Sequence, residues 1–99
     1  MGVLNKLKEM ILGETIDYAD LISKGAIVVD VRTKSEFKSG HIPGSKNIPL
    51  NEISAKLDVL KGKEVILVCR SGARSGQAKS ILTSNGIYAH NAGAWQTLV

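Results

Sequence analysis

The sequence is poor in the residues that most often reveal a structural or binding class. Its 99 residues include one cysteine, two prolines and four aromatic residues. A single cysteine cannot form a disulfide within the chain. One cysteine with two histidines also lacks the ligand spacing of a zinc site. We therefore expect no metal site, and nothing in the sequence implies an organic cofactor.

Long hydrophobic runs are missing as well. The longest apolar segments, such as 26–29 and 65–69, are far shorter than the ~20 residues that span a bilayer. The segment 1–13 has no uninterrupted apolar core and no small-residue cleavage site, so it does not have the pattern of a signal peptide. We expect a cytoplasmic protein without membrane association.

Acidic residues are outnumbered by basic ones, nine to thirteen, which gives a net charge of +4. The lysines are scattered, and the few aromatic residues offer little for base stacking, so nucleic-acid binding is not expected. A content of 43% hydrophobic and 22% charged residues is typical of one soluble globular domain. The arginines at 70 and 74 are the exception to the scatter, because they flank the single cysteine.

Strand and helix patterns alternate along the chain. Residues 3–12 have helical apolar spacing, which predicts an amphipathic helix within 1–13 that packs on a domain of residues 14–99; a membrane-surface helix is the less favoured alternative. The predicted strands are 14–16, 26–31, 65–69 and 87–91. The predicted helices are 18–24, 34–39, 51–60 and 75–84, with a final turn at 94–98. The alternation predicts an α/β fold, a small doubly wound parallel sheet flanked by helices.

Local signals set several of these boundaries. Asp17 and Asn51 are predicted helix caps, and Thr33 with Glu36 matches a capping box. Tyr18, Leu21 and Ile22 are expected to face the core. The stretch HIPGSKNIPL, residues 41–50, is predicted to be irregular because of its two prolines and its glycine.

Cys69 lies where the strand 65–69 ends, which is the edge of a parallel sheet at which ligands bind. Gly72 permits a positive φ, so the loop can direct the amides of Ser71, Gly72, Ala73, Arg74 and Ser75 inward, and the following helix adds its positive end. Arg70 and Arg74 add positive charge. This arrangement predicts an anion site with Cys69 as a thiolate.

Simple magnitudes indicate which effect dominates at Cys69. Lowering a thiol pKa from ~8.5 to ~6.5 needs about 2.7 kcal/mol. A helix N-terminus contributes only ~0.3–1 kcal/mol, whereas a hydrogen bond to a charged acceptor contributes ~1.5–3 kcal/mol. The loop amides are therefore expected to dominate and the arginines to come second. A buried, inert cysteine is the alternative interpretation.

Two motifs resemble those of a known family. D-V-R…E-F…G-H-I-P-G-x-x-N-I-P and C-R-S-G-x-R-S, followed by NAGAW, are similar to single-domain rhodaneses of the phage shock protein E-like type, from about Asp17 to Trp95. That type includes periplasmic members, so a periplasmic location stays open if a leader was removed. The family commonly has Gly-Gly where this chain has Gly93 and Ala94.

The resemblance implies a thiosulfate sulfurtransferase. Cys69 would take the outer sulfur of thiosulfate or another persulfide donor, and pass it to cyanide, a low-molecular-weight thiol or a thioredoxin-like protein. Arg70 and Arg74 would attract the donor. Thiolate attack on sulfur needs no positioned general base. A persulfide carrier or interaction module is the alternative. A cysteine phosphatase or arsenate reductase is disfavoured, because cysteine phosphatases have C-x5-R where this loop has C-x4-R.

Other residues receive supporting roles. Asp30 ends a strand and belongs to the family signature, so we expect it, with Arg32, to support the Cys69 loop. Arg32 and Glu36 are also predicted to form a local ion pair. We expect His41 to bind nearby backbone, and Trp95 to close the core instead of lining the site. His90 is expected to be peripheral.

Overall fold

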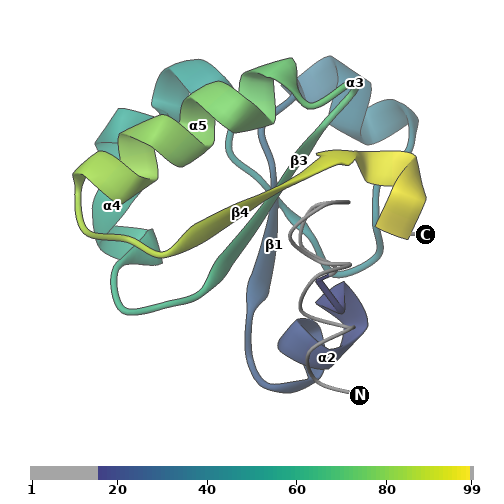
Figure 1. Cartoon of the computed structure of the whole chain (residues 1–99). Coiled ribbons are helices and arrows are strands. Elements are labelled where there is room, and N and C mark those ends of the chain that lie inside the picture. The colour runs from purple at the N-terminus through teal and green to yellow at the C-terminus, as the bar shows by residue number, and fades with distance from the viewer. Residues whose placement is uncertain (1–15, 99) are drawn as a thin grey trace.

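The computed structural model describes residues 16–98, and its centre is a four-stranded parallel sheet between helical layers (Figure 1). The strand order is β2-β1-β3-β4, and every neighbouring pair is parallel. The strands are β1 (Ile27–Asp30), β2 (Lys46–Asn47), β3 (Val65–Cys69) and β4 (Ala89–Ala94). The α-helices are α2 (Tyr18–Ser23), α3 (Lys34–Ser39), α4 (Leu57–Leu60) and α5 (Ala73–Ser84), and the 3-10 helices are η1 (Leu50–Lys56) and η2 (Trp95–Leu98).

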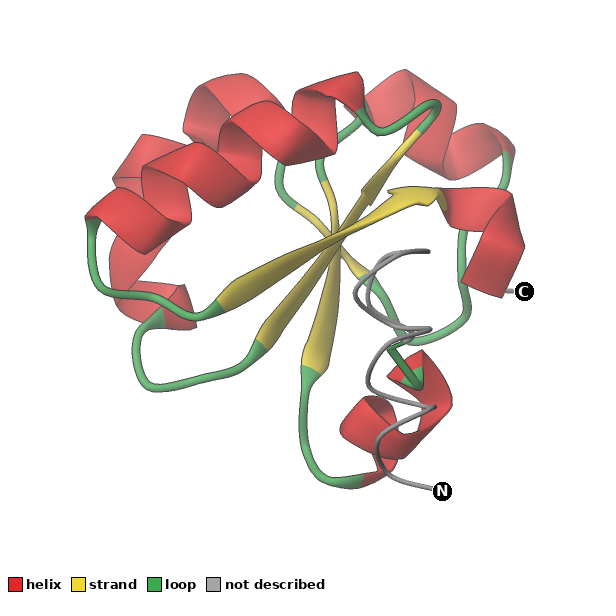
Figure 2. Cartoon of the chain, in the orientation of Figure 1, coloured by secondary structure: helices red, strands yellow, loops and turns green. Residues whose placement is uncertain are grey.

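Side-chain alternation along β3 divides the core into two layers. Val65, Leu67 and Cys69 pack toward α5 and η1, together with Ala78, Leu82 and Ile53. Ile66 and Val68 pack on the opposite face, against residues of α2 and η2. Figure 2 shows α5 and α4 on one side of the sheet, and α2 and the C-terminal turn on the other. Because β3 is buried on both faces, its sequence is a continuous apolar run. The predicted α/β fold class is confirmed.

The predicted caps of the first two described helices are confirmed. The Asp17 side chain accepts a hydrogen bond from the amide of Asp20 at the start of α2. Thr33 and Glu36 form the reciprocal capping box of α3, which ends before Gly40. Tyr18 and Leu21 contact the core as predicted, but Ile22 does not, because it is 42% exposed.

Three other predictions are wrong in detail. The segment 41–50 contains β2, which pairs with β1 through Asp30 and Asn47; two residues are too few for a strand pattern to show. The helix predicted from Asn51 is the 3-10 helix η1 followed by α4, and Pro49 precedes it without a side-chain cap. Helix α5 begins at Ala73 instead of Ser75.

The last strand also differs from the prediction, since it spans Ala89–Ala94 and not 87–91. Its register with β3 shifts by one residue, so that Leu67 pairs with Asn91 while Val68 pairs with Gly93. Such an extra residue is a β-bulge. Gly93 has a φ of +83°, and Ala94 has a negative φ, so only the first position of the family's Gly-Gly pair needs glycine here.

The helix predicted within 1–13 and most of the strand predicted at 14–16 lie outside the described residues. Within residues 16–98 no helix is both long enough and apolar enough to cross a bilayer.

Candidate active site around Cys69

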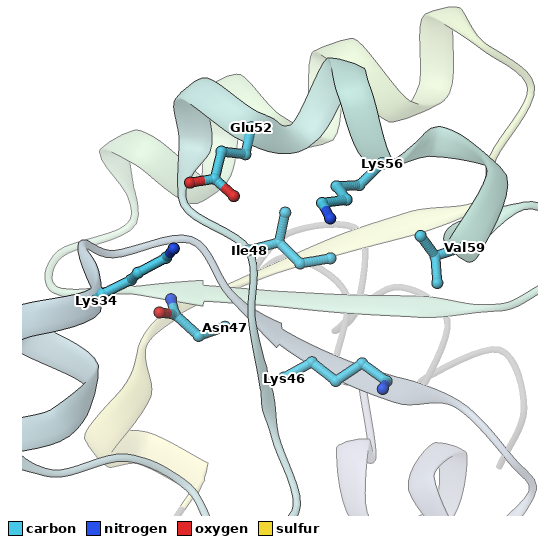
Figure 3. Close-up of a pocket in the computed structure, with 7 residues that line it drawn as sticks. All are labelled: Lys34, Lys46, Asn47, Ile48, Glu52, Lys56 and Val59. Carbon is cyan, nitrogen blue, oxygen red and sulfur yellow. The ribbon is translucent and has the colours of Figure 1, made fainter.

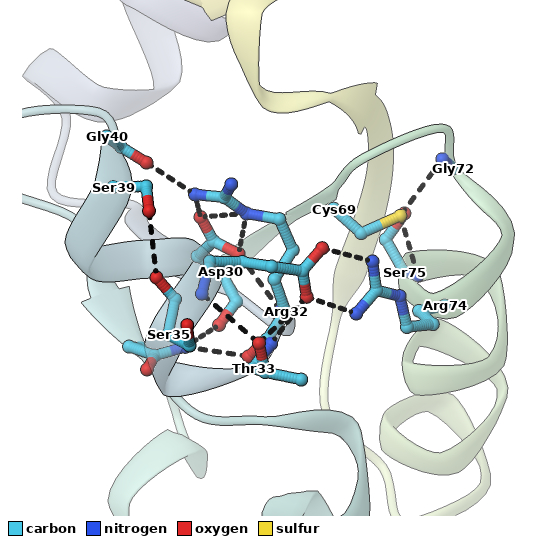
Figure 4. A network of polar contacts seen from close by, with 12 residues as sticks. Asp30, Arg32, Thr33, Ser35, Ser39, Gly40, Cys69, Gly72, Arg74 and Ser75 are labelled. Carbon is cyan, nitrogen blue, oxygen red and sulfur yellow. Dashed lines mark hydrogen bonds and ion pairs between the residues drawn. The ribbon is translucent and has the colours of Figure 1, made fainter.

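Cys69 is the last residue of β3, and its side chain points toward the first turn of α5 (Figure 4). Only 1% of the residue is exposed. The chain then turns through residues 70–72 and enters α5 directly. Residues 69–75 are called the Cys69 loop below. The sulfur therefore lies at the bottom of this loop and not on its rim.

The Cys69 sulfur is held by groups from its own loop. The Gly72 amide donates to Sγ at 2.9 Å, and the Ser75 amide donates at 3.4 Å. The Ser75 hydroxyl oxygen lies 3.3 Å from Sγ. Gly72 has a φ of +101°, a left-handed conformation that residues with a Cβ rarely adopt. This conformation turns the amide at position 72 back toward the sulfur.

These contacts favour the ionised thiol. Burial acts to raise the pKa of the Cys69 thiol, but hydrogen bonds from the Ser75 hydroxyl and from the Ser75, Gly72 and Ser71 amides outweigh it, so the pKa is below its usual value. No arginine is among these main causes. The geometry thus agrees with a thiolate activated mainly by loop donors.

Arg74 is engaged by a residue of α3. Its guanidinium donates to both carboxylate oxygens of Glu36, at 2.8 and 3.0 Å, and about a third of each side chain is exposed. This fork lowers the pKa of Glu36 well below its usual range and raises that of Arg74. The predicted ion pair between Arg32 and Glu36 is therefore wrong, since Glu36 pairs with Arg74.

The remaining residues of the Cys69 loop lie on its outside. Arg70, Ser71 and Ala73 are exposed. Among the ion pairs of residues 16–98, none engages Arg70. Arg70 is therefore the arginine of the loop whose charge is free to attract an anion.

Asp30 and Arg32 form a buried ion pair beside the site. Asp30 accepts from the Arg32 amide, from Nε at 2.9 Å and from the terminal nitrogen at 2.7 Å. The same guanidinium donates to the Gly40 carbonyl at 2.7 Å and lies 4.7 Å from the centre of the Trp95 ring. The Arg32 guanidinium thus connects the end of α3 to η2. The described hydrogen bonds of the Asp30 carboxylate go to Arg32 and not to the Cys69 loop.

Asn91 is a site residue that the sequence analysis did not identify. Its Nδ2 donates to the Gly72 carbonyl at 3.0 Å, and its Oδ1 accepts from the Ser75 hydroxyl at 2.6 Å and from the Gly93 amide at 3.0 Å. It lies within the NAG stretch that carries part of the family resemblance. The signal available in the sequence was its position at the end of the strand predicted at 87–91, because ligands bind at the carboxyl ends of parallel strands.

Neither histidine contacts the sulfur. His41 Nδ1 donates to the Phe37 carbonyl at 2.8 Å, and its ring stacks on that of Phe37, which confirms the predicted backbone contact. His90 Nε2 lies 2.6 Å from a carboxylate oxygen of Glu64 and pairs in register with Ile66, so it belongs to the middle of the sheet. Within the described part of the chain, no group of His, Cys, Asp or Glu side chains has a metal-binding arrangement.

Two pockets lie away from the sulfur. One, of about 300 Å³, is lined by Arg74 at the edge of the Cys69 loop and by residues of the segments after β1 and β2, the apolar Val31, Pro49 and Leu50 with the polar Thr33 and Asn51. The other, of about 420 Å³, contains no residue of that loop. Figure 3 shows its lysines 34, 46 and 56 around Ile48, with Glu52 as the acidic residue. Part of the excess positive charge is therefore remote from the cysteine.

The fold and the loop together define a class of protein, an α/β domain with a buried cysteine under loop amide donors at the carboxyl edge of a parallel sheet. The rhodanese-like domain family matches residues 14–96. The thiosulfate sulfurtransferase PspE of Escherichia coli is 39% identical over 70 residues, which cover 66% of this chain and 66% of that protein. The chain belongs to the rhodanese-like domain family.

Solved structures agree with this assignment. SSP1007 from Staphylococcus saprophyticus aligns with a TM-score of 0.69 and 32% identity over 96% of this chain and 88% of its own. A rhodanese with anions from E. coli aligns with a TM-score of 0.68 and 32% identity over 73% and 89%. The chain spans between 14% and 66% of the length of four curated relatives. Membership of this family supports sulfur transfer as the general chemistry of the site.

Proposed function

We propose that the chain is a thiosulfate sulfurtransferase that works through a persulfide on Cys69. The observation that carries this proposal is the set of donors on Sγ, the amides of Gly72 and Ser75 with the Ser75 hydroxyl close by. A thiolate held in this way is a ready nucleophile toward divalent sulfur. The name of the E. coli relative, thiosulfate sulfurtransferase, supports the choice of donor.

The proposed cycle has two sulfur displacements. The Cys69 thiolate attacks the outer sulfur of thiosulfate, so that a new S–S bond forms and the bond between the two thiosulfate sulfurs breaks. Sulfite leaves with the electron pair of that bond. A nucleophilic acceptor, cyanide or a thiolate, then attacks the terminal sulfur of the Cys69 persulfide. This second step releases thiocyanate or the acceptor persulfide and regenerates the Cys69 thiolate.

The cations beside the loop have unequal roles in donor binding. Arg70 is free to attract the thiosulfate anion as it approaches. Arg74 has two of its five N–H donors on Glu36, at 2.8 and 3.0 Å, so its pairing with that carboxylate competes with the sulfonate oxygens for the guanidinium charge. The pocket next to Arg74 offers about 300 Å³, which has room for the organic part of a small thiol acceptor.

Intact-mass spectrometry of the full chain tests the first half of this cycle. Thiosulfate should add one sulfur atom to the protein and release sulfite, and the Cys69→Ser variant should gain nothing. No addition to folded protein would refute the proposal. Cyanide should then remove the sulfur as thiocyanate with repeated turnover. If one sulfur is added and removed but the cycle does not repeat with both reagents present, the result would instead favour a persulfide carrier that depends on a partner protein.

A further inference from the structure

The Ser75 hydroxyl lies between two groups that compete for one proton. Its oxygen is 2.6 Å from Asn91 Oδ1 and 3.3 Å from Cys69 Sγ. A serine hydroxyl has a single hydrogen and can donate to only one of them at a time. The shorter contact, with good hydrogen-bond length for two oxygens, is the one to Asn91.

The orientation of the Asn91 amide is fixed by two other contacts. Its Nδ2 donates to the Gly72 carbonyl and its Oδ1 accepts from the Gly93 amide, both at 3.0 Å. Turning the amide over would place the NH₂ group against the Gly93 N–H and the oxygen against the Gly72 carbonyl. Oδ1 therefore faces Ser75, and because it can only accept, Ser75 must be the donor.

This assignment also fixes the proton at the cysteine. If the hydroxyl donates to Asn91, it presents only lone pairs to Cys69 Sγ. The contact between sulfur and oxygen is then an S–H donating to Ser75 Oγ, which belongs to the neutral thiol. The hydroxyl can stabilise the thiolate only after it turns away from Asn91 toward the sulfur.

We propose that Asn91 is a positioning residue that holds the Ser75 hydroxyl proton away from the Cys69 sulfur until that sulfur ionises. When the thiol proton leaves to solvent, the hydroxyl rotates and donates to the thiolate, because a charge-assisted bond is the stronger one. The S–H bond is the only covalent bond that breaks in this step. Once Sγ is the neutral inner sulfur of a persulfide, a state that rests on the proposed function, the hydroxyl returns to Asn91.

The proposal predicts opposite effects for two members of one network. Loss of the Ser75 hydroxyl removes a donor from the thiolate and should raise the Cys69 pKa. Loss of the Asn91 amide removes the competing acceptor and should lower it. If Asn91 only supported the loop through Gly72, its removal would loosen the amides and raise the pKa in the same direction as the loss of Ser75.

The test is the pH dependence of Cys69 alkylation by iodoacetamide in the full chain, measured without any sulfur donor. Ser75→Ala should raise the pKa by about one unit, and Asn91→Ala should lower it by about half a unit, as expected for one hydrogen bond lost or released. The double variant should match Ser75→Ala alone. An Asn91→Ala pKa that is unchanged or raised would overturn the proposal, as would a lowering that persists without Ser75.

A second variant covers the possibility that Asn91→Ala does not fold. Asn91→Asp keeps an acceptor for both Ser75 and Gly93, binds the hydroxyl more strongly, and should raise the Cys69 pKa. In the Ser75→Ala background the increase in the Cys69 pKa should be smaller, because the introduced carboxylate then acts on the sulfur only through its charge. An equal rise in both backgrounds would refute the role of the hydroxyl. The alkylation experiment uses no sulfur donor. Its result therefore does not depend on whether thiosulfate forms a persulfide on Cys69.

Discussion

Replacing Gly72 with alanine tests whether the Cys69 loop activates the sulfur through its amides. The added Cβ would meet the Gly93 Cα at 3.5 Å, which is ordinary contact, so space does not limit the change. The backbone does, because the φ of +101° costs a residue with a Cβ about 1–2 kcal/mol. The turn can relieve this cost only by moving the Gly72 amide.

The expected change in the Cys69 pKa follows from the hydrogen bond that is lost when the Gly72 amide moves. The amide at position 72 donates to Sγ at 2.9 Å, and a hydrogen bond to a charged acceptor contributes ~1.5–3 kcal/mol. At about 1.4 kcal/mol per pKa unit, full loss of this bond raises the Cys69 pKa by roughly one to two units. The variant should also lose thermal stability, by about 4–8 °C for each kcal/mol in a domain of this size.

Gly86→Ala is the matched control. Gly86 also has a positive φ, +75°, with nothing within 4 Å of an added Cβ, and it lies just beyond the far end of α5. It should cost similar stability without changing the Cys69 pKa. The measurements are the alkylation rate of Cys69 against pH and the melting temperature. If Gly72→Ala melts like Gly86→Ala and keeps the wild-type pKa, the loop amides do not activate the sulfur.

Three further predictions concern the ion pairs. Glu36→Gln should free Arg74, so the KM for thiosulfate should fall; a higher KM would show that the fork with Glu36 positions Arg74 for the donor. The lowered pKa of Glu36 adds stability that is fully present above its unfolded value of ~4.3 and declines as the pH falls below it. Wild-type melting temperature should therefore drop more steeply than that of Glu36→Gln between about pH 4.3 and pH 3, and parallel curves would contradict this. Asp30→Asn leaves Arg32 buried without its charge partner and should destabilise the fold by about 3–5 kcal/mol in urea unfolding, with little change in the Cys69 pKa; an unchanged stability would refute the importance of this pair.

The sequence predicted the parts of the fold whose signals are local. The apolar runs that form β1 and β3 can be recognised because both faces of these strands are buried. The capping box at Thr33 needs only four residues. The two-residue strand β2 depends on pairing with β1, and no pattern within so short a segment could reveal it.

The site was predictable around the cysteine and not beyond it. The loop motif predicted the Gly72 and Ser75 contacts to Sγ, because they lie within six residues of Cys69. Glu36 meets Arg74 across 38 residues of sequence, and its local match to the capping box hid this second role. Asn91 was missed for a similar reason, since its hydrogen bonds to Gly72 and Ser75 form only when β4 lies beside the loop.

The bulge in β4 limits how the length of this segment can change. The extra residue of the bulge is Ala92, which lies between Asn91 and Gly93, and these two pair with consecutive residues of β3. Deleting Ala92 would leave Gly93 and Ala94 able to pair with Val68 and Cys69 as they do now, so the indole would stay beside Arg32, which it meets at 4.7 Å. The same deletion would bring Gly93 next to Asn91 and remove the spacing in which the Gly93 amide donates to Asn91 Oδ1. A single missing residue here would therefore spare the C-terminal turn and disturb the side chain that orients the Ser75 hydroxyl. Working variants of this chain should accordingly differ between Asn91 and Trp95 by substitution much more often than by the gain or loss of one residue.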